Sequence, residues 1–147
     1  MLLLRSEDMK RIADQAEAAY PGEACGLLLG FHRTCGDIEV IRVAESENMA
    51  SPGRNDRFEV DPELRLSLMR EVRGTGCAIV GHYHSHPNGL AQPSATDLAM
   101  AYEPELVWLI TAVIGGQAVQ STAHLLSPGG TQFDDIGLGC LCTANTT

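Results

Sequence analysis

The feature that most constrains this chain is a short apolar run that leads directly into three histidines. Residues 77–80 are apolar, and His82, His84 and His86 follow at every second position. Such a run is typical of a buried β-strand. Side chains alternate between the two faces of a strand, so we expect the three imidazoles on one face. Two imidazoles held in this way can reach one metal ion.

A helix start follows this strand after a short loop. Ser94 is a typical helix N-cap, which places Asp97 in the first helical turn. A carboxylate at that position can lie beside the end of the strand. Two His and one Asp are typical ligands of a catalytic zinc ion, with the fourth position left for water. The spacing alone leaves open which two of the three histidines are the ligands.

Each of these residues also has an ordinary structural explanation. A His near a strand end is usually a partly exposed polar residue. An Asp in the first turn of a helix usually interacts with the helix dipole and its free N–H groups. Taken singly, the observations favour these explanations, whereas the combination of same-face histidines with a nearby helix cap favours a metal site.

A resemblance to a known family selects among the histidines. The segment His84-Ser85-His86-Pro87, followed by Ser94 and Asp97, resembles the signature of the JAMM (MPN+, Mov34/PAD-1-like) zinc metalloproteases. Ten residues, numbers 87–96, separate the second histidine from Asp97, as the family pattern requires. Pairing His82 with His84 would break that spacing and lose the following proline.

The family pattern also includes a glutamate far upstream, and Glu23 matches it. Glu23 lies in the family-like phrase Gly22-Glu23-Ala24-Cys25-Gly26-Leu27-Leu28-Leu29-Gly30. With both segments present in order, the resemblance spans residues 21–126, which is most of the chain. The chain is most similar to compact members of prokaryotic type.

The resemblance implies a role for each matched residue. His84, His86 and Asp97 would hold one Zn²⁺ per chain, with water as the fourth ligand. Glu23 would take a proton from that water and pass it to the leaving amine. Ser94 would donate a hydrogen bond to the oxyanion. A hydroxyl has two lone pairs and one proton, so Ser94 can also accept a hydrogen bond as a helix cap.

The remaining pattern predicts an α/β fold in which a mixed sheet is covered by helices. The expected strands are residues 2–4 at a sheet edge, 24–30, 38–44, 58–60, 77–80, 106–114, 117–126 and 131–133. The expected helices begin at Ser6, Asp61 and Ser94 and end near Pro21, Gly74 and Tyr102. The resemblance implies a curved mixed sheet flanked by helices, similar to that of the cytidine deaminases. Zinc deaminases carry His-x-Glu and Pro-Cys-x-x-Cys, and this sequence has neither.

Length and composition predict one domain over residues 1–147, with a core at about 2–134 and a loose segment at 137–147. The net charge of −9 argues against nucleic-acid and anionic membrane partners. Charges follow directly after the apolar residues 1–4, and the apolar runs are shorter than a membrane span. We therefore expect neither a secretory signal nor a membrane segment.

The five cysteines show no regular framework, which favours reduced thiols and a cytoplasmic protein. Cys25 and Cys77 lie in apolar segments and are expected to be small buried side chains. Cys140 and Cys142 form a Cys-x-Cys pair near the terminus, a weak signal for metal binding or oxidation.

The resemblance implies a zinc metallopeptidase. Relatives that open ubiquitin chains carry insertions around the groove, and the matching positions are short here, at residues 46–57 and 115–116. We therefore expect cleavage of a peptide or isopeptide bond after the C-terminal Gly-Gly of a ubiquitin-like sulfur-carrier protein (ThiS- or MoaD-like). Such a tail can pair with an exposed strand edge. The alternatives are a metal-free MPN-like protein-interaction scaffold and a zinc hydrolase of a small amide. The sequence does not determine the oligomeric state.

Overall fold

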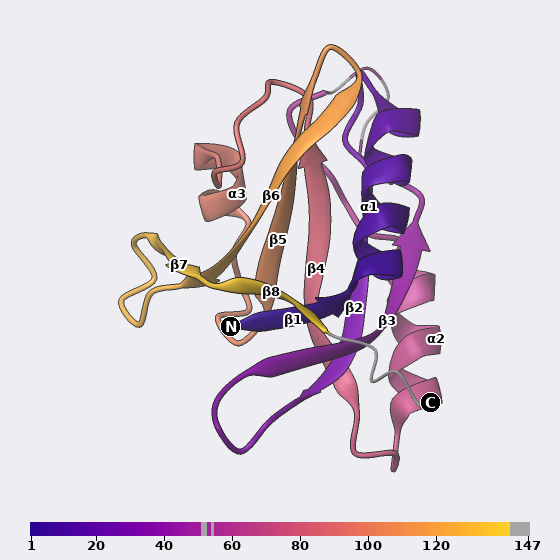
Figure 1. Ribbon diagram of the computed structural model, residues 1–147, viewed down its shortest axis with the longest axis vertical. Helices are drawn as coiled ribbons and strands as arrows, with labels where there is room; N and C mark the ends of the chain where they lie inside the picture. Colours follow the sequence, from indigo (N-terminus) through magenta and orange to yellow (C-terminus); the bar gives the residue numbers. More distant parts are fainter. Residues whose placement is uncertain (51–52, 54, 142–147) are drawn as a thin grey trace.

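The computed structural model describes residues 1–50, 53 and 55–141 (Figure 1). These residues form one eight-stranded sheet with the strand order β7-β6-β5-β4-β2-β3-β1-β8. The elements are β1 (Leu2–Arg5), α1 (Ser6–Ala19), β2 (Cys25–His32), β3 (Ile38–Ser46), α2 (Pro62–Val72), β4 (Ala78–His86), α3 (Ala95–Ala99), β5 (Val107–Ile114), β6 (Gln117–Leu126), β7 (Phe133–Ile136) and β8 (Leu138–Leu141).

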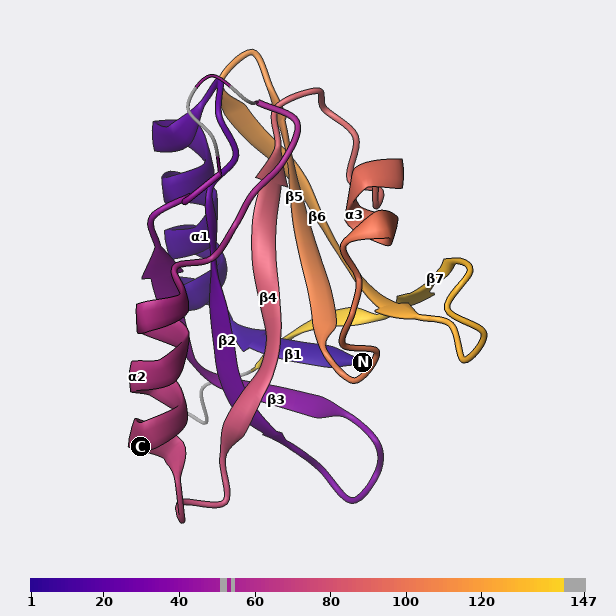
Figure 2. The same ribbon diagram turned by 180° about the vertical axis from the view of Figure 1, so that it is seen from behind.

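The sheet is mixed and curved, as expected. β4 pairs antiparallel with β2 and parallel with β5, while β1 and β8 run across the direction of these strands (Figure 1). Helix α1 covers one face of the sheet, and α2 and α3 lie on the other (Figure 2). The parallel β4–β5 pair needs a crossover connection, and that connection contains α3. The crossover therefore brings α3 to the end of β4.

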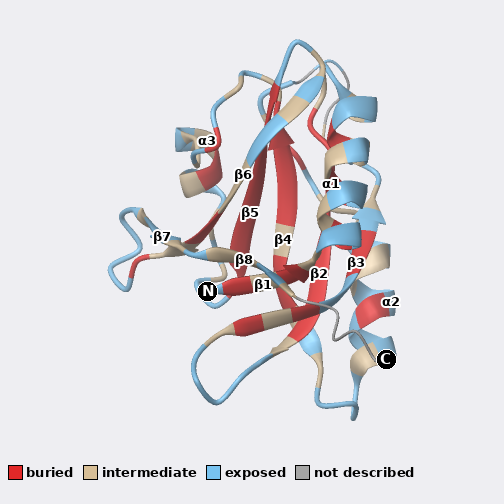
Figure 3. Ribbon diagram, in the orientation of Figure 1, coloured by how far each residue is buried: buried red, intermediate tan, exposed pale blue. Residues whose placement is uncertain are grey.

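The two faces of β2 are buried against different helices. Leu28 packs in the same cluster as Ile12 of α1, whereas Leu27 and Leu29 pack with Leu68 of α2. The central strands are buried along most of their length (Figure 3). Burial on both faces explains why these strands read as continuous apolar runs rather than as alternating patterns.

Several local signals predicted the structure correctly. Asp61 caps α2, since its side chain accepts a hydrogen bond from Glu63 N, and Pro62 is the first helical residue. Gly115 and Gly116 connect β5 to β6 with φ angles of +57° and +84°, as a two-residue turn of this kind requires. Helix α1 begins at Ser6 as expected. Its N-cap, however, is Arg5, and Ser6 is the first residue of the helix itself.

The expectation for the two chain ends was wrong. Residues 2–4 were expected at a sheet edge, but β1 pairs parallel with both β3 and β8. Residues 138–141 were expected to be loose, but they form the edge strand β8; residues 142–147 lie outside the described residues. Gly139 explains the close approach, because a Cβ atom there would lie 2.8 Å from Met1 Sδ and 2.9 Å from Leu3 Cδ2.

Other boundaries also moved. Residues 58–60 contribute only a one-residue bridge between Asn48 and Val60, and the last predicted strand lies at Phe133–Ile136 instead of 131–133. Helix α3 ends at Ala99, well before the expected Tyr102. Strand β4 starts at Ala78 instead of Cys77 and runs through His86, so the three histidines lie on the strand as expected.

The helices are short, and α1 is the longest of those described, with 14 residues. Among the described residues, no helix has the length and apolar character to cross a membrane. Of the cysteines discussed above, Cys25 is buried as expected, whereas Cys77 is half-buried and lies outside β4. Cys140 is exposed with a free thiol, and Cys142 lies outside the described residues.

Candidate metal centre

The end of β4 brings two imidazoles together. His84 and His86 lie on the same face of the strand, and their Nε2 atoms are 2.9 Å apart. Asp97 Oδ2 lies 3.2 Å from His84 Nε2 and 3.0 Å from His86 Nε2. All three residues are buried. Three potential ligand atoms therefore converge on one point.

A capping box aims Asp97 at this point. The Ser94 hydroxyl accepts a hydrogen bond from Asp97 N over 3.0 Å, and Asp97 Oδ2 accepts one from Ser94 N over 2.9 Å. These reciprocal bonds fix the carboxylate at the start of α3. The helix has only five residues. Its contribution to the site is this first turn, which faces the end of β4.

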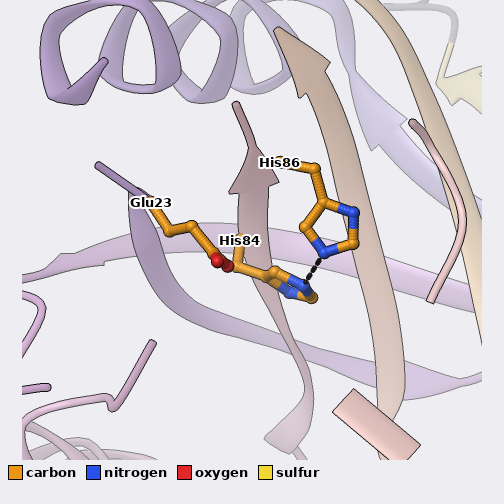
Figure 4. Close-up of side chains that lie close together, drawn as sticks. All are labelled: Glu23, His84 and His86. Atoms are coloured by element: carbon orange, nitrogen blue, oxygen red, sulfur yellow. Dashed lines mark hydrogen bonds between the residues drawn. The ribbon is translucent and has the colours of Figure 1, made fainter. Parts of the chain in front are cut away.

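Glu23 and Ala24 directly precede β2, and hydrogen bonds between their backbone and neighbouring side chains hold them at the site. Ala24 N donates to Ser85 Oγ over 2.8 Å, and Asn48 Nδ2 donates to Glu23 O over 3.0 Å. The Glu23 carboxylate points toward the His84 ring (Figure 4). Ligand atoms of Glu23, His84 and His86 lie within 4.8 Å of one another.

Burial controls the proton affinity of Glu23. Its side chain is only 4% exposed, and Oε1 has no hydrogen-bond partner among the described residues. Burial raises the pKa of Glu23 to about 8, although the nearby His86 opposes the shift. A cation bound beside the carboxylate would lower this pKa again.

The pKa values of Asp97, His84 and His86 depend on one another. Burial alone would raise the pKa of Asp97, but hydrogen bonds from His84 and His86 hold it well below its usual range. Burial lowers the pKa of His84 despite the opposing effect of Asp97. For His86, burial also acts to lower the pKa, but the hydrogen bond and charge of Asp97 raise it overall. An ionised carboxylate thus faces two imidazoles.

The arrangement fits a tetrahedral metal ion. Ligand atoms about 2.0–2.1 Å from a tetrahedral zinc ion are about 3.3 Å from one another, close to the observed 2.9–3.2 Å. His86 Nδ1 lies 2.8 Å from the acceptor Leu90 O, so this nitrogen donates and Nε2 keeps its lone pair. A nitrogen, nitrogen and oxygen donor set is that of many catalytic zinc sites.

His82 shares the face of the other two histidines but lies apart from this convergence. Its ring packs edge-on against Trp108 with centroids 4.2 Å apart, and Phe58 lies 5.5 Å away. Its Nδ1 has no hydrogen-bond partner among the described residues. Burial lowers the pKa of His82 to about 3. The ring is therefore a neutral part of an aromatic wall.

Phe58 is a site residue that the sequence did not identify. Its ring stacks on His84 with centroids 4.2 Å apart and an interplanar angle of 16°. Phe58 comes from the connection between β3 and α2, and a single Phe in a polar segment carries no signal for such a contact. Trp108 is buried and forms part of the same wall, with its ring edge-on to Phe58.

A small pocket opens over Glu23 and the oxyanion candidate Ser94. Its volume is about 220 Å³. Its lining residues are Glu23, Asn55, Asp56, His86, Pro87, Asn88, Ser94 and Thr96. A separate apolar pocket of about 310 Å³ lies beside His82, Phe58 and Trp108. The smaller pocket brings the Glu23 carboxylate and the Ser94 hydroxyl to one space.

Comparisons with known proteins identify the family of this chain. A family model described as prokaryotic homologs of the JAB domain matches residues 6–125. A desampylase from Haloferax volcanii is 34% identical over 104 residues, which cover 71% of this chain and 69% of the relative. A CysO-cysteine peptidase from Mycobacterium tuberculosis is 27% identical over 112 residues, or 76% of this chain and 73% of the relative.

The fold is also similar to a solved structure. The solution structure of a protein from Desulfitobacterium hafniense superposes with a TM-score of 0.80 at 30% identity, covering 96% of this chain and 93% of that one. The range matched by the family model spans the positions of Glu23, His84, His86 and Asp97. The chain belongs to the family of prokaryotic homologues of the JAB domain, as its JAMM-like signature predicted.

Proposed function

We propose that this protein is a zinc metallopeptidase that hydrolyses a peptide or isopeptide bond after the C-terminal Gly-Gly of a ubiquitin-like sulfur-carrier protein. The observation that carries the proposal is the convergence of His84 Nε2, His86 Nε2 and Asp97 Oδ2 beside a buried carboxylate. The names of the relatives, a desampylase and a CysO-cysteine peptidase, support hydrolysis of ubiquitin-like protein conjugates.

The metal would be held by residues from two elements. His84 and His86 come from β4, and Asp97 comes from the first turn of α3. A bound zinc ion supplies Lewis acidity that polarises the scissile carbonyl and the attacking water. The metal-free scaffold alternative is disfavoured, because such a scaffold has no need for three converging, buried ligand atoms.

Glu23 would move the proton during cleavage. The attacking water gives its oxygen to the carbonyl carbon and one proton to the Glu23 carboxylate. The bond between carbon and the leaving nitrogen then breaks, and Glu23 returns the proton to that nitrogen. Its buried position supports this role, because the low polarity around Oε1 favours the protonated form that must exist between the two transfers.

Ser94 would stabilise the developing oxyanion. As the cap of α3, its Oγ accepts a hydrogen bond from Asp97 N, which uses a lone pair and leaves the hydroxyl proton available. The same hydroxyl group lies in the wall of the pocket that contains Glu23. One side chain can therefore serve as helix cap and as oxyanion donor together.

The size of the pocket supports a glycine tail. Its volume of about 220 Å³ is below the range of about 300–1,000 Å³ common for drug-sized ligands. A segment without side chains fits such a space. The tail was expected to pair with an exposed strand edge beside the metal, but β4 is paired with β2 and β5 on its two sides. Any pairing would involve a neighbouring segment instead.

The test uses mass spectrometry of a sulfur-carrier protein that bears one residue beyond its terminal Gly-Gly. The zinc-loaded protein should release that residue, and the Glu23→Gln protein should not. A carrier in which Ala-Leu replaces Gly-Gly is the specificity control. Equal cleavage of both carriers would contradict the Gly-Gly preference, and a lack of cleavage of every such carrier would contradict the substrate class.

A further inference from the structure

The loop that joins the two halves of the candidate metal centre carries a hydrogen bond to one ligand. Residues 87–93 connect His86 at the end of β4 to Ser94 at the start of α3. His86 donates its Nδ1 proton to Leu90 O, 2.8 Å away. The position of the Leu90 carbonyl therefore determines which nitrogen of His86 keeps its lone pair for the centre.

The path of the loop is set at this point by a side-chain hydrogen bond and a close backbone approach. Leu90 N donates to Asn88 Oδ1 over 3.0 Å, which forms a tight turn. Gly89 has a φ of +79°, and a Cβ atom there would lie 2.7 Å from Ile114 Cγ1 on β5. The course of the loop thus depends on a small number of specific contacts.

A threonine from a distant strand holds the next carbonyl. Thr122 Oγ1 of β6 lies 2.5 Å from Ala91 O, to which it donates. Thr122 lies opposite Ile110 of β5, and Ile110 lies opposite His84 of β4. Residues directly opposite one another project to the same face of a sheet, so Thr122 projects to the face that carries the centre.

A buried histidine sets the direction of the Thr122 hydroxyl. His124 is only 2% exposed, and its Nε2 lies 2.8 Å from Thr122 Oγ1. A hydroxyl has one proton, and Ala91 O already takes it. His124 Nε2 must therefore carry hydrogen and donate to Thr122 Oγ1. On the other side of the ring, Nδ1 lies 2.7 Å from Asp135 Oδ1 of β7, without hydrogen-bond alignment.

We propose that Thr122 and His124 are positioning residues for the metal centre, which hold Ala91 so that the adjacent Leu90 carbonyl keeps accepting the Nδ1 proton of His86. The proposal rests on the proposed function, because it treats His86 as a metal ligand. Partners that orient a ligating histidine through an outer hydrogen bond typically change metal affinity by about 10–100-fold when they are removed. In this protein Thr122 acts on His86 indirectly, because it holds Ala91 and the adjacent Leu90 carbonyl makes the contact with His86.

The test compares Thr122→Val, Thr122→Ser and Thr111→Val by competition with a zinc chelator. Thr122→Val has nearly the same shape but lacks the hydroxyl, and it should bind zinc about tenfold more weakly. Thr122→Ser should restore the affinity. Thr111 is the matched control, since it is buried on the neighbouring strand but bonds to Ser121 over 2.8 Å. Thr111→Val should bind zinc as the wild type does.

A second pair tests His124. Glutamine can donate to Thr122 from a similar position, so His124→Gln should keep the zinc affinity that His124→Leu loses. Unfolding by urea without metal measures stability separately. Unchanged affinity in folded Thr122→Val, or an equal loss in Thr111→Val, would overturn the proposal.

An independent readout separates this inference from the proposed function. The ¹⁵N signals of the His86 ring in the metal-free protein should change in Thr122→Val and return in Thr122→Ser. If the wild type binds no zinc while these signals change as expected, the proposed function fails, and only the positioning of the His86 ring by Thr122 stands. If the wild type binds zinc and the signals are the same in all variants, the positioning role fails alone.

Discussion

The two ends of the histidine segment of β4 lie on one face of one strand, yet their surroundings differ. At the C-terminal end of this segment, His84 and His86 direct their Nε2 atoms toward Asp97, and Glu23 lies beside them. At the other end, the His82 ring lies edge-on against Trp108, with centroids 4.2 Å apart. The Nδ1 atoms of His82 and His84 both lack a hydrogen-bond partner among the described residues. Residue type and spacing are the same, so these features cannot decide which ring is a ligand.

The difference lies in what other elements bring to each end. The helix cap delivers a carboxylate to His84 and His86, and the loop carbonyl of Leu90 fixes the tautomer of His86. His82 packs edge-on against Trp108, whereas Phe58 contacts both ends, because it stacks on His84 and lies 5.5 Å from His82. A histidine therefore becomes a ligand candidate through partners that orient it and supply negative charge.

The largest effect should follow from replacing a candidate ligand with alanine. His84→Ala should lower turnover about 1,000-fold or more, because it removes the several kcal/mol that a bound metal supplies. His82→Phe, which preserves the aromatic wall, should stay within about threefold of the wild type, since His82 contributes no atom to the converging ligands or to the pocket that contains Glu23. Steady-state cleavage assays measure both, and similar losses in the two variants would erase the contrast between the two ends.

Glu23→Gln should reduce turnover by about 10²–10⁴-fold, the usual contribution of a general acid–base group. Glutamine has the same shape but cannot hold the transferred proton. Zinc content should remain that of the wild type, and substrate affinity should change little. Loss of zinc from this variant would make Glu23 a ligand, and retained turnover would remove it from the mechanism.

Ser94→Ala should lower turnover about 10²–10³-fold through the lost oxyanion donor. It should also lower the free energy of unfolding by about 1 kcal/mol through the lost cap. Asp61→Ala is the matched control, because Asp61 caps α2 by accepting from Glu63 N at 2.9 Å. It should cost similar stability and leave turnover unchanged. Urea unfolding and cleavage assays together separate the two roles of Ser94.

The smallest effect concerns pH and the metal-free protein. The folded-state pKa of Glu23, about 8, lies above its ordinary value of 4.5, so the folded state binds the proton more tightly. Stability should therefore fall as pH rises from about 4.5 to about 8. Glu23→Gln lacks this carboxyl group, so its stability advantage over the wild type should grow across that window. Urea unfolding with chelator at pH 5 and pH 8 measures it, and an equal difference at both would contradict the shift.

The site was more predictable from the sequence than the sheet was. His84, His86, Ser94 and Asp97 lie in one short segment whose strand, loop and helix cap each leave a local signal. Glu23 is distant in sequence, and only the resemblance pointed to it. Its place beside β4 depends on the pairing of Cys25 with His84, which no local pattern encodes.

The strand pairings at the chain ends escaped prediction for the same reason. β8 contains glycine and only four residues, a composition typical of loose segments, and it becomes a strand because β1 offers an edge. α3 was predicted too long because Met100 and Ala101 favour helix locally, while the site uses only its first turn. Thr122 and His124 gave no sequence signal, because their role depends on a contact with a loop about 30 residues away.

The most direct test of the central claim is the zinc content of purified protein, measured by mass spectrometry of the metal in the wild type, His82→Ala and His84→Ala. We expect about one zinc ion per chain in the wild type and in His82→Ala, and essentially none in His84→Ala. Zinc retained by His84→Ala and lost from His82→Ala would contradict the assignment of the metal centre. A wild type that binds no zinc after loading would contradict the metallopeptidase itself.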